Sequence, residues 1–340
     1  MKRILLIATG GTIASSQSED GLTPSIDVKQ LLSYIPDVKN MCELEGISIM
    51  NVDSTNMNPS LMVQIAEAVA AHYEQYDGFV VSHGTDTMAY SSAALTYMLK
   101  NLRKPVVFTG SQLPIEAMYT DAKQNLSDAI RFACEDISGV FLAFDGRLIS
   151  GVHAMKVKTR SNDAFASINF PAIATIKYGK ITYDKALDYG NYWGKMKQEA
   201  EGAFEIATNL CEDIFVLKMF PGIGPEIFDF IKGHYKGVII ESFGIGGIPN
   251  VDHDIVAKVH ELVVSGAAVV ITTQCTYEGI DLDIYEVGQK LAKQNAIIAG
   301  DMTTEALTMK LMWALGNFEE IRDVKAYMEM PCCGDRSDEK

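Results

Sequence analysis

Short, uninterrupted apolar runs recur through the first half of the chain, and helix-like segments separate them. The runs are rich in Val, Ile, Leu and Phe, which suits strands that are buried on both faces of a parallel sheet. They cover residues 4–8, 78–82, 105–109 and 139–144. Strands that alternate with helices predict βαβ units with right-handed crossovers, and therefore an α/β fold with a mostly parallel sheet.

The segments between these runs have the spacing of amphipathic helices. Asn58 followed by Pro59 is typical of a helix N-cap with proline in the first turn. From residue 61 to residue 73, apolar side chains recur at intervals of three and four, which marks one buried helix face. Two further predicted helices cover residues 88–99 and 121–134.

The alternation stops between about residues 182 and 213 and then resumes. Turn-forming residues at 189–194 and the charges after them predict an exposed linker. We expect an N-terminal domain over residues 1–188, a linker over 189–212 and a smaller C-terminal α/β domain over 213–340. In the second domain, predicted strands cover residues 214–219, 237–240 and 267–272, and predicted helices cover 223–232, 255–264 and 303–315.

Charge and composition exclude several kinds of partner. The net charge of −15 repels nucleic-acid phosphates and anionic membrane surfaces, so we expect neither as a partner. No apolar run approaches the roughly 20 residues of a membrane helix, and the run after Arg3 is too short for a signal peptide. The six cysteines lack zinc-binding spacing and predict reduced thiols in a cytoplasmic protein. We assign no function to the adjacent Cys332 and Cys333.

Small hydroxyl residues beside glycine follow three of the predicted strands. Ligands of open parallel sheets bind beyond the carboxyl ends of strands, so a site is expected at these positions. The segments are TGGTIA at 9–14, HGTDTMA at 83–89 and TGSQ at 109–112. Together they predict a small polar cradle of hydroxyls and backbone N–H groups, suited to a small zwitterionic ligand. In a simpler interpretation, the glycines only turn the chain and Asp86 or Thr87 caps the next helix.

Common cofactor-binding motifs are absent from the sequence. It contains neither the GxGxxG of a dinucleotide loop nor the Gly-Lys-Ser/Thr of a P-loop, so a nucleotide-binding flavodoxin-like protein is not expected. The six histidines form neither an HExxH nor a triad pattern, and we expect a structural role for His83. We expect no metal and no cofactor.

The segments TGGTIA at 9–14 and HGTDTMAYS at 83–91 resemble those of the bacterial-type L-asparaginases, most closely the cytoplasmic type I branch. The resemblance covers nearly the whole chain. It continues through VDST at 52–55, TGSQ at 109–112, DGR at 145–147, DAF at 163–165, GIGG at 244–247 and GDMT at 300–303. It implies a larger domain with a mostly parallel flavodoxin-like sheet and a smaller α/β domain. The implied reaction is hydrolysis of L-asparagine to L-aspartate and ammonia, with minor glutaminase activity.

The resemblance also implies roles for matching residues. Thr12 corresponds to the nucleophile that attacks the side-chain amide. Thr85, Asp86 and Lys156 correspond to the second catalytic threonine, its neighbouring acid and a lysine. Lys156 is placed by counting back from the DAF segment, and Lys158 stands only two residues away.

The implied substrate-binding turn is Asp53, Ser54 and Thr55, together with Thr85 and Asp86. Ser54 faces the α-carboxylate of the substrate in this comparison, and Asp86 faces its α-ammonium group. Backbone N–H groups near the two catalytic threonines are candidate donors to the oxyanion.

One position departs from the family pattern. Many members carry a tyrosine on the loop after the nucleophile, where this chain has Leu22. Tyr277 in the second domain is a candidate substitute, and a purely structural tyrosine is the alternative. The polar segment 15–23 is either a lid that closes over substrate or an ordinary surface loop.

Two other functions compete with asparagine hydrolysis. The ammonia-liberating subunit of an archaeal-type tRNA-dependent amidotransferase resembles the same motifs but carries an extra N-terminal domain, whereas TGGTIA starts here at residue 9. The negative charge also disfavours a tRNA complex. A non-catalytic amino-acid-binding protein would bind asparagine without releasing ammonia, and the two threonines with a matching lysine argue against it. The resemblance further implies a homodimer or homotetramer.

Overall fold

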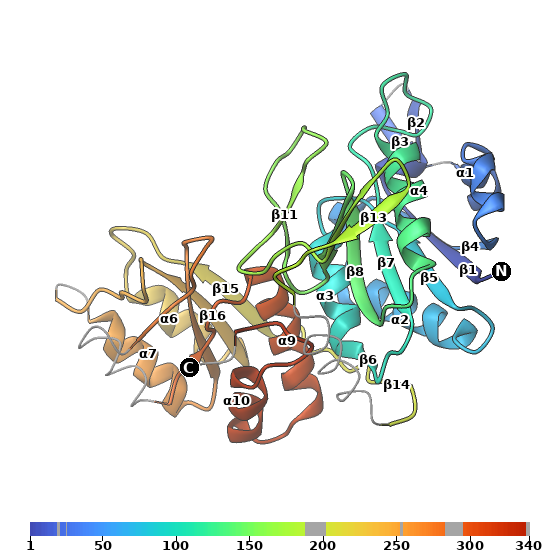
Figure 1. The fold of residues 1–340 in the computed structure, drawn as a ribbon. Coiled ribbons are helices and arrows are strands. Elements are labelled where there is room, and N and C mark those ends of the chain that lie inside the picture. The colour runs from blue at the N-terminus through green and yellow to red at the C-terminus, as the bar shows by residue number, and fades with distance from the viewer. Residues whose placement is uncertain (19–20, 25, 188–201, 252–253, 283–294, 338–340) are drawn as a thin grey trace. The chain divides into compact units, whose positions relative to one another are not determined.

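The computed structural model of the chain describes residues 1–18, 21–24, 26–187, 202–251, 254–282 and 295–337. The chain divides into two units, Met1–Thr208 and Asn209–Lys340. An eight-stranded sheet forms the centre of unit 1 and a four-stranded sheet that of unit 2 (Figure 1). Helices accompany both sheets, which confirms the predicted α/β class with a larger and a smaller domain.

Five parallel strands form the core of the first sheet. They are β1 (Arg3–Gly10), β4 (Glu43–Val52), β5 (Gly78–Ser82), β7 (Pro105–Thr109) and β8 (Gly139–Phe144). Their order is β4-β1-β5-β7-β8, which is the 2-1-3-4-5 order of flavodoxin-like sheets. Every apolar run predicted in this half of the chain is one of these strands, and only β4 was not predicted.

Three antiparallel strands extend the sheet beyond β8. They are β9 (Arg147–Ser150), β12 (Ala174–Lys177) and β13 (Lys180–Tyr183). The sequence analysis missed them, as it missed β4 at the opposite edge. Burial alternates along β12 instead of being continuous, so the apolar run that identifies a central strand is absent there.

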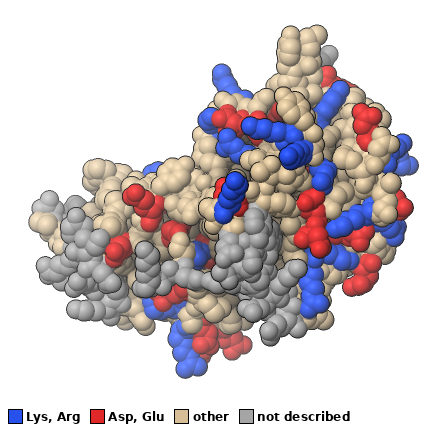
Figure 2. Space-filling view, in the orientation of Figure 1, with Lys and Arg blue, Asp and Glu red and all other residues tan. Residues whose placement is uncertain are grey.

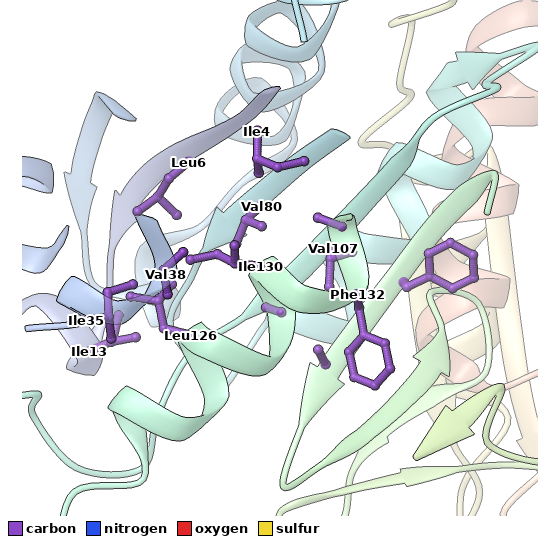
Figure 3. Close-up of a cluster of buried hydrophobic side chains, with 14 of the residues drawn as sticks. Ile4, Leu6, Ile13, Ile35, Val38, Val80, Val107, Leu126, Ile130 and Phe132 are labelled. Atoms are coloured by element: carbon purple, nitrogen blue, oxygen red, sulfur yellow. The ribbon is translucent and has the colours of Figure 1, made fainter. Parts of the chain in front are cut away.

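One face of the sheet packs against α1 (Val28–Ser33) and α4 (Ala122–Ala133). Figure 3 shows Leu126, Ile130 and Phe132 of α4 beside strand residues such as Val80 and Val107. Alternate residues of the same strands are buried on the other face, where α2 (Pro59–His72) and α3 (Met88–Met98) pack. The sheet is therefore covered by helices on both faces.

The start of α2 confirms the predicted cap. Asn58 Oδ1 accepts a hydrogen bond from the Leu61 N–H at 3.1 Å, and Pro59 opens the helix. Proline costs nothing at this position, because the first N–H of a helix has no partner within the helix.

Part of the expected linker belongs to unit 1. Residues 188–201 lie outside the described residues. Beyond them, β14 (Glu205–Ile206) pairs antiparallel with β6 (Leu99–Lys100) at the end of α3. The first unit therefore includes residues up to Thr208.

Unit 2 has a parallel sheet in chain order, formed by β15 (Ile214–Lys218), β16 (Gly237–Ser242), β17 (Ala268–Thr273) and β18 (Ile297–Ile298). Apolar residues of α6 (Glu226–Ile231) and α7 (Ile255–Val264) share one core cluster with these strands. The sheet also contacts α9 (Thr304–Asn317) and α10 (Ile321–Glu329). The strands and helices predicted for this half are confirmed, whereas β18 and α10 were not predicted.

A charged pair is fully buried in unit 2. Lys310 Nζ of α9 lies 2.8 Å from Asp335 Oδ2, and neither side chain is exposed. The ammonium group also donates to the Met330 carbonyl at 2.8 Å, and Asp335 Oδ1 accepts from the Cys332 N–H at 2.9 Å. An unpaired buried charge costs several kcal/mol. Residues 330–335 therefore complete the packing of α9.

Candidate active site

The strand order reverses between the carboxyl ends of β1 and β5, which is where open α/β sheets have a crevice. From β1 the chain passes to β4, which lies on one side of β1 in the sheet. The later strands β5, β7 and β8 lie in turn on the other side of β1. Ligands of open α/β sheets bind where the strand order reverses in this way. Thr12 follows β1 and Thr85 follows β5, so the two predicted catalytic threonines lie at this point.

Glycines bring three segments of the crevice into backbone contact. Gly10 and Gly11 have φ values of 104° and 78°, which residues with a Cβ rarely adopt. A Cβ on Gly10 would lie 2.5 Å from the Val52 nitrogen, and a Cβ on Gly11 would lie 2.4 Å from the Gly84 nitrogen. A Cβ on Gly84 would lie 2.5 Å from Ser54 Oγ. The segments TGGTIA, VDST and HGTD therefore meet only because these positions lack side chains.

Lys156 joins Thr85 and Asp86 at this edge. Its Nζ lies 2.7 Å from Thr85 Oγ1 and 2.6 Å from Asp86 Oδ1. Thr85 is buried and the Lys156 side chain is 18% exposed, whereas that of Asp86 is 53% exposed. Lys156 ends β10 (Ala154–Lys156), which pairs with β11 (Phe165–Ser167) outside the main sheet. The structure thus brings together the three residues that the resemblance grouped.

Lys158 points to a different partner. It forms an ion pair with Asp163, and both side chains are more than 40% exposed. Of the two lysines, Lys156 is therefore the one that contacts Thr85, and its catalytic role stays a prediction.

The turn at residues 53–55 is built around Asp53. Its Oδ1 accepts hydrogen bonds from the N–H and the Oγ1 of Thr55, both at 2.9 Å. Ser54 is buried, and its Oγ accepts from the Asp86 N–H at 3.2 Å. Thr87 Oγ1 donates to the Ser54 carbonyl at 2.8 Å and makes no cap bond to α3. Thr87 therefore occupies the N-cap position of α3, but the side chains of Asp86 and Thr87 bond to Lys156 and Ser54 instead of capping the helix.

Gln112 is a site residue that the sequence analysis did not assign. Its Oε1 accepts a long hydrogen bond of 3.5 Å from Thr85 Oγ1, and its Nε2 donates to the Ser161 carbonyl at 3.1 Å. Its backbone N–H donates to the carboxylate of buried Asp121, at 3.1 and 3.0 Å. The available signal was its position in TGSQ, directly after a predicted strand.

His83 lies beneath the HGTD turn with no exposed surface. Its Nδ1 is 2.7 Å from the Gly84 carbonyl oxygen, and its Nε2 is 2.9 Å from Ser91 Oγ. Burial lowers the pKa of His83 to about 4, so the ring is neutral near pH 7. A carbonyl oxygen only accepts, so Nδ1 carries the proton and Ser91 donates to Nε2.

Acidification is expected to destabilise the native protein through this buried ring. The pKa of an ordinary imidazole is 6.5, whereas that of His83 in the folded protein is about 4. Between these values only the unfolded state binds the proton, so the free energy of unfolding falls as the pH drops, by about 2–3 kcal/mol at pH 4.5. Denaturant unfolding at pH 7 and pH 4.5 measures this loss. The His83→Asn variant cannot titrate there and should lose correspondingly less stability. If the wild type and the His83→Asn variant lost the same free energy of unfolding, the loss would not come from His83.

The segment after Thr12 is a hairpin and not the loop that was expected. β2 (Ser15–Ser18) pairs antiparallel with β3 (Gly21–Pro24). Residues 19 and 20 and the side chain of Leu22 lie outside the described residues. Tyr277 is exposed in unit 2, and its role as a substitute for the missing tyrosine stays a prediction.

Metal-binding and membrane-spanning features are both missing from the described part of the chain. No group of three or more His, Cys, Asp or Glu residues there has the arrangement of a metal site. Within the same residues, no helix has the length and apolarity needed to cross a membrane.

The fold and the site together define a two-unit α/β protein whose crevice combines threonine hydroxyls with a lysine–carboxylate pair. The family model "Asparaginase, N-terminal" matches residues 3–189, and "Glutaminase/Asparaginase C-terminal domain" matches residues 213–328. The chain belongs to the asparaginase family, as the resemblance predicted.

Relatives in this family include two kinds of protein. The L-asparaginase of Thermococcus kodakarensis is 35% identical over 334 residues, which cover 98% of each chain. A glutamyl-tRNA(Gln) amidotransferase subunit of Pyrococcus abyssi is 34% identical over 341 residues, which cover 96% of this chain and 75% of that relative.

Solved structures agree with this family. The thermostable L-asparaginase of Thermococcus kodakarensis has a TM-score of 0.91 and 34% identity, and the match covers 99% of this chain and 100% of that one. L-asparaginase I of Vibrio cholerae has a TM-score of 0.88 and 30% identity, with 99% of both chains covered.

Proposed function

We propose that this protein is a cytoplasmic enzyme that hydrolyses L-asparagine to L-aspartate and ammonia. In this proposal Thr12 is the nucleophile, and Thr85, Asp86 and Lys156 support it. The observation that carries the proposal is the position of Lys156 Nζ, which contacts both Thr85 Oγ1 and Asp86 Oδ1. This contact lies at the crevice where the Gly11–Gly84 approach brings the segment of Thr12 against that of Thr85.

The reaction divides into two steps. The Thr12 hydroxyl attacks the side-chain amide carbon, and the tetrahedral intermediate expels ammonia to leave an ester on Thr12. Water then attacks the ester carbonyl, releases aspartate and restores the hydroxyl. Two steps of this kind are easier than one direct attack by water, but a threonine hydroxyl needs a base or a polarising neighbour at neutral pH. Thr85 with Lys156 is the group available for that task.

The substrate's charged ends have matching partners in the crevice. The half-exposed Asp86 carboxylate suits the α-ammonium group. Ser54 Oγ already accepts from the Asp86 N–H, so its own hydroxyl hydrogen is available for the α-carboxylate. When the substrate's α-ammonium group binds to Asp86, it shares that carboxylate with Lys156. The interaction between Asp86 and the lysine is then weaker. Fixing both ends of the substrate presents its amide to Thr12.

Ammonia release from L-asparagine and L-glutamine by the protein alone tests the proposal. We expect asparagine to be preferred by about 10- to 200-fold in kcat/KM, since one methylene is worth about 1–3 kcal/mol. No release from either amide by the folded protein would refute the proposed function.

The second candidate is the ammonia-liberating subunit of an amidotransferase, which is favoured by the 34% identity to the Pyrococcus abyssi protein. The net charge of −15 disfavours a complex with tRNA. Figure 2 shows that on this face the described Lys and Arg side chains lie among Asp and Glu side chains. Ammonia release that requires an added partner protein and charged tRNA would favour this candidate.

We also infer, from the family alone, that the protein forms a homodimer or homotetramer. Light scattering coupled to size-exclusion chromatography measures the mass directly, and a monomer at micromolar concentration would contradict the inference.

A further inference from the structure

The peptide between Gly84 and Thr85 is held on one side by His83. Nδ1 of the buried ring donates to the Gly84 carbonyl oxygen at 2.7 Å. In a trans peptide the C=O bond and the following N–H bond point in opposite directions. The Thr85 N–H therefore points away from the imidazole. Among residues 1–18, 21–24, 26–187, 202–251, 254–282 and 295–337, none accepts a hydrogen bond from it.

The ring that holds this peptide is itself fixed from several directions. The backbone N–H of His83 donates to the Thr109 carbonyl at 2.8 Å, and the imidazole ring packs edge-on against the ring of Phe108. A Cβ on Gly110 would lie 2.3 Å from the His83 carbonyl oxygen, so the two backbones are in close contact. Ser91 of α3 donates to Nε2 at 2.9 Å. The tautomer and the orientation of the imidazole are thus both determined by its surroundings.

We propose that His83 is a positioning residue, which presents the Thr85 N–H as a fixed donor to the oxyanion of the tetrahedral intermediate. Ser91 supports it by holding the proton of the ring on Nδ1. The inference rests on the proposed function, because it concerns the same reaction. The donor N–H belongs to Thr85, whose Oγ1 also contacts Lys156. The preceding residue, Gly84, lies against the backbone of Gly11. Donors oriented before the reaction lower the barrier without reorganisation.

The experiment compares two replacements of His83 with a matched control. In His83→Leu the donor to Gly84 is lost, and we expect kcat for asparagine to fall about 100-fold with KM changed by less than about threefold. In His83→Asn the amide nitrogen takes the place of Nδ1, and kcat should stay within about tenfold of the wild type. Thr96→Val is the control, because it removes a buried hydroxyl that bonds to the Ser92 carbonyl of the same helix. It should leave both constants unchanged.

Two further measurements keep the inference open to refutation. If His83→Leu does not fold, Ser91→Ala retains the ring but frees its tautomer, and kcat should fall about tenfold at constant KM. Nitrogen-15 NMR of the wild type should show a proton on Nδ1 of His83, and the Thr85 amide resonance should shift in the Ser91→Ala and His83→Leu variants.

The outcomes separate this inference from the proposed function. A wild type that releases no ammonia refutes the function, and the inference with it. An active wild type whose His83→Leu and His83→Asn variants lose turnover equally, or whose His83→Leu variant keeps full kcat, refutes the inference alone. An unchanged Thr85 amide resonance in His83→Leu also overturns it.

Discussion

Thr12→Val is expected to lower kcat for L-asparagine by about 10³-fold or more, with a folded protein and little change in thermal stability. Valine has the shape of threonine without its hydroxyl, so the change removes the nucleophile and little else. The neighbouring Gly11–Gly84 contact is made by backbone atoms and does not depend on the side chain at position 12. Initial rates of ammonia release, with circular dichroism of the same samples, measure the effect.

Thr12→Ser is the matched control for this prediction. It retains a primary hydroxyl at the same position and should keep measurable turnover. A folded Thr12→Val protein whose kcat lies within about tenfold of the wild type would show that another group forms the covalent bond. Thr85 would then be the next residue to test, since its hydroxyl contacts Lys156.

Lys156→Met should lower kcat by about 10²- to 10⁴-fold, the range for removal of a general base or its supporting group. Methionine keeps an unbranched chain of similar length but cannot bond to Thr85 Oγ1 or Asp86 Oδ1. The Asp86 carboxylate is left without its lysine, but it is about half exposed and stays solvated. Stability should therefore change far less than turnover does, and thermal unfolding beside steady-state kinetics tests both statements.

Lys158→Met is the control for the lysine, because it lies two residues away and also pairs with a carboxylate. Exposed ion pairs contribute little to stability, so this variant should keep kcat within about threefold of the wild type. A larger loss of turnover in Lys158→Met than in Lys156→Met would reverse the assignment of the catalytic lysine.

The central strands were predictable because burial on both faces requires continuous apolar runs. β5, β7 and β8 have the predicted bounds for this reason. The edge strands were missed because an edge needs apolar residues on one face only. In β4, Glu43, Glu45 and Gly46 interrupt the first half of the strand, and none of its side chains is fully buried. Short antiparallel strands such as β12 have the same weakness.

The candidate site was predictable where it depends on the sheet. Thr12 and Thr85 follow neighbouring parallel strands, so their segments had to meet at one edge. Lys156 was different, because it ends a two-stranded hairpin outside the main sheet, and only the family resemblance indicated it. The role of Gln112 depends on a side-chain contact across separate loops, which no local pattern encodes.

The hairpin β2–β3 was missed for another reason. Its sequence, SSQS followed by GLTP, has too few apolar residues to show an alternating pattern. Pairing between two short strands is stabilised mainly by their own backbone hydrogen bonds and by what they pack against, and neither is visible in the sequence.

The buried pair of Lys310 and Asp335 has a consequence for synthesis on the ribosome. Lys310 is incorporated 25 residues before Asp335, the aspartate that neutralises it. In the folded protein both side chains are fully buried. Until residue 335 emerges from the exit tunnel, α9 cannot pack with its lysine charged except at a cost of several kcal/mol. Unit 1 contains no part of this pair and is free to fold while the remainder is being translated. We therefore expect nascent chains that stall before residue 335 to carry a native first unit and an unfinished second one, which makes them natural substrates for chaperones and proteases.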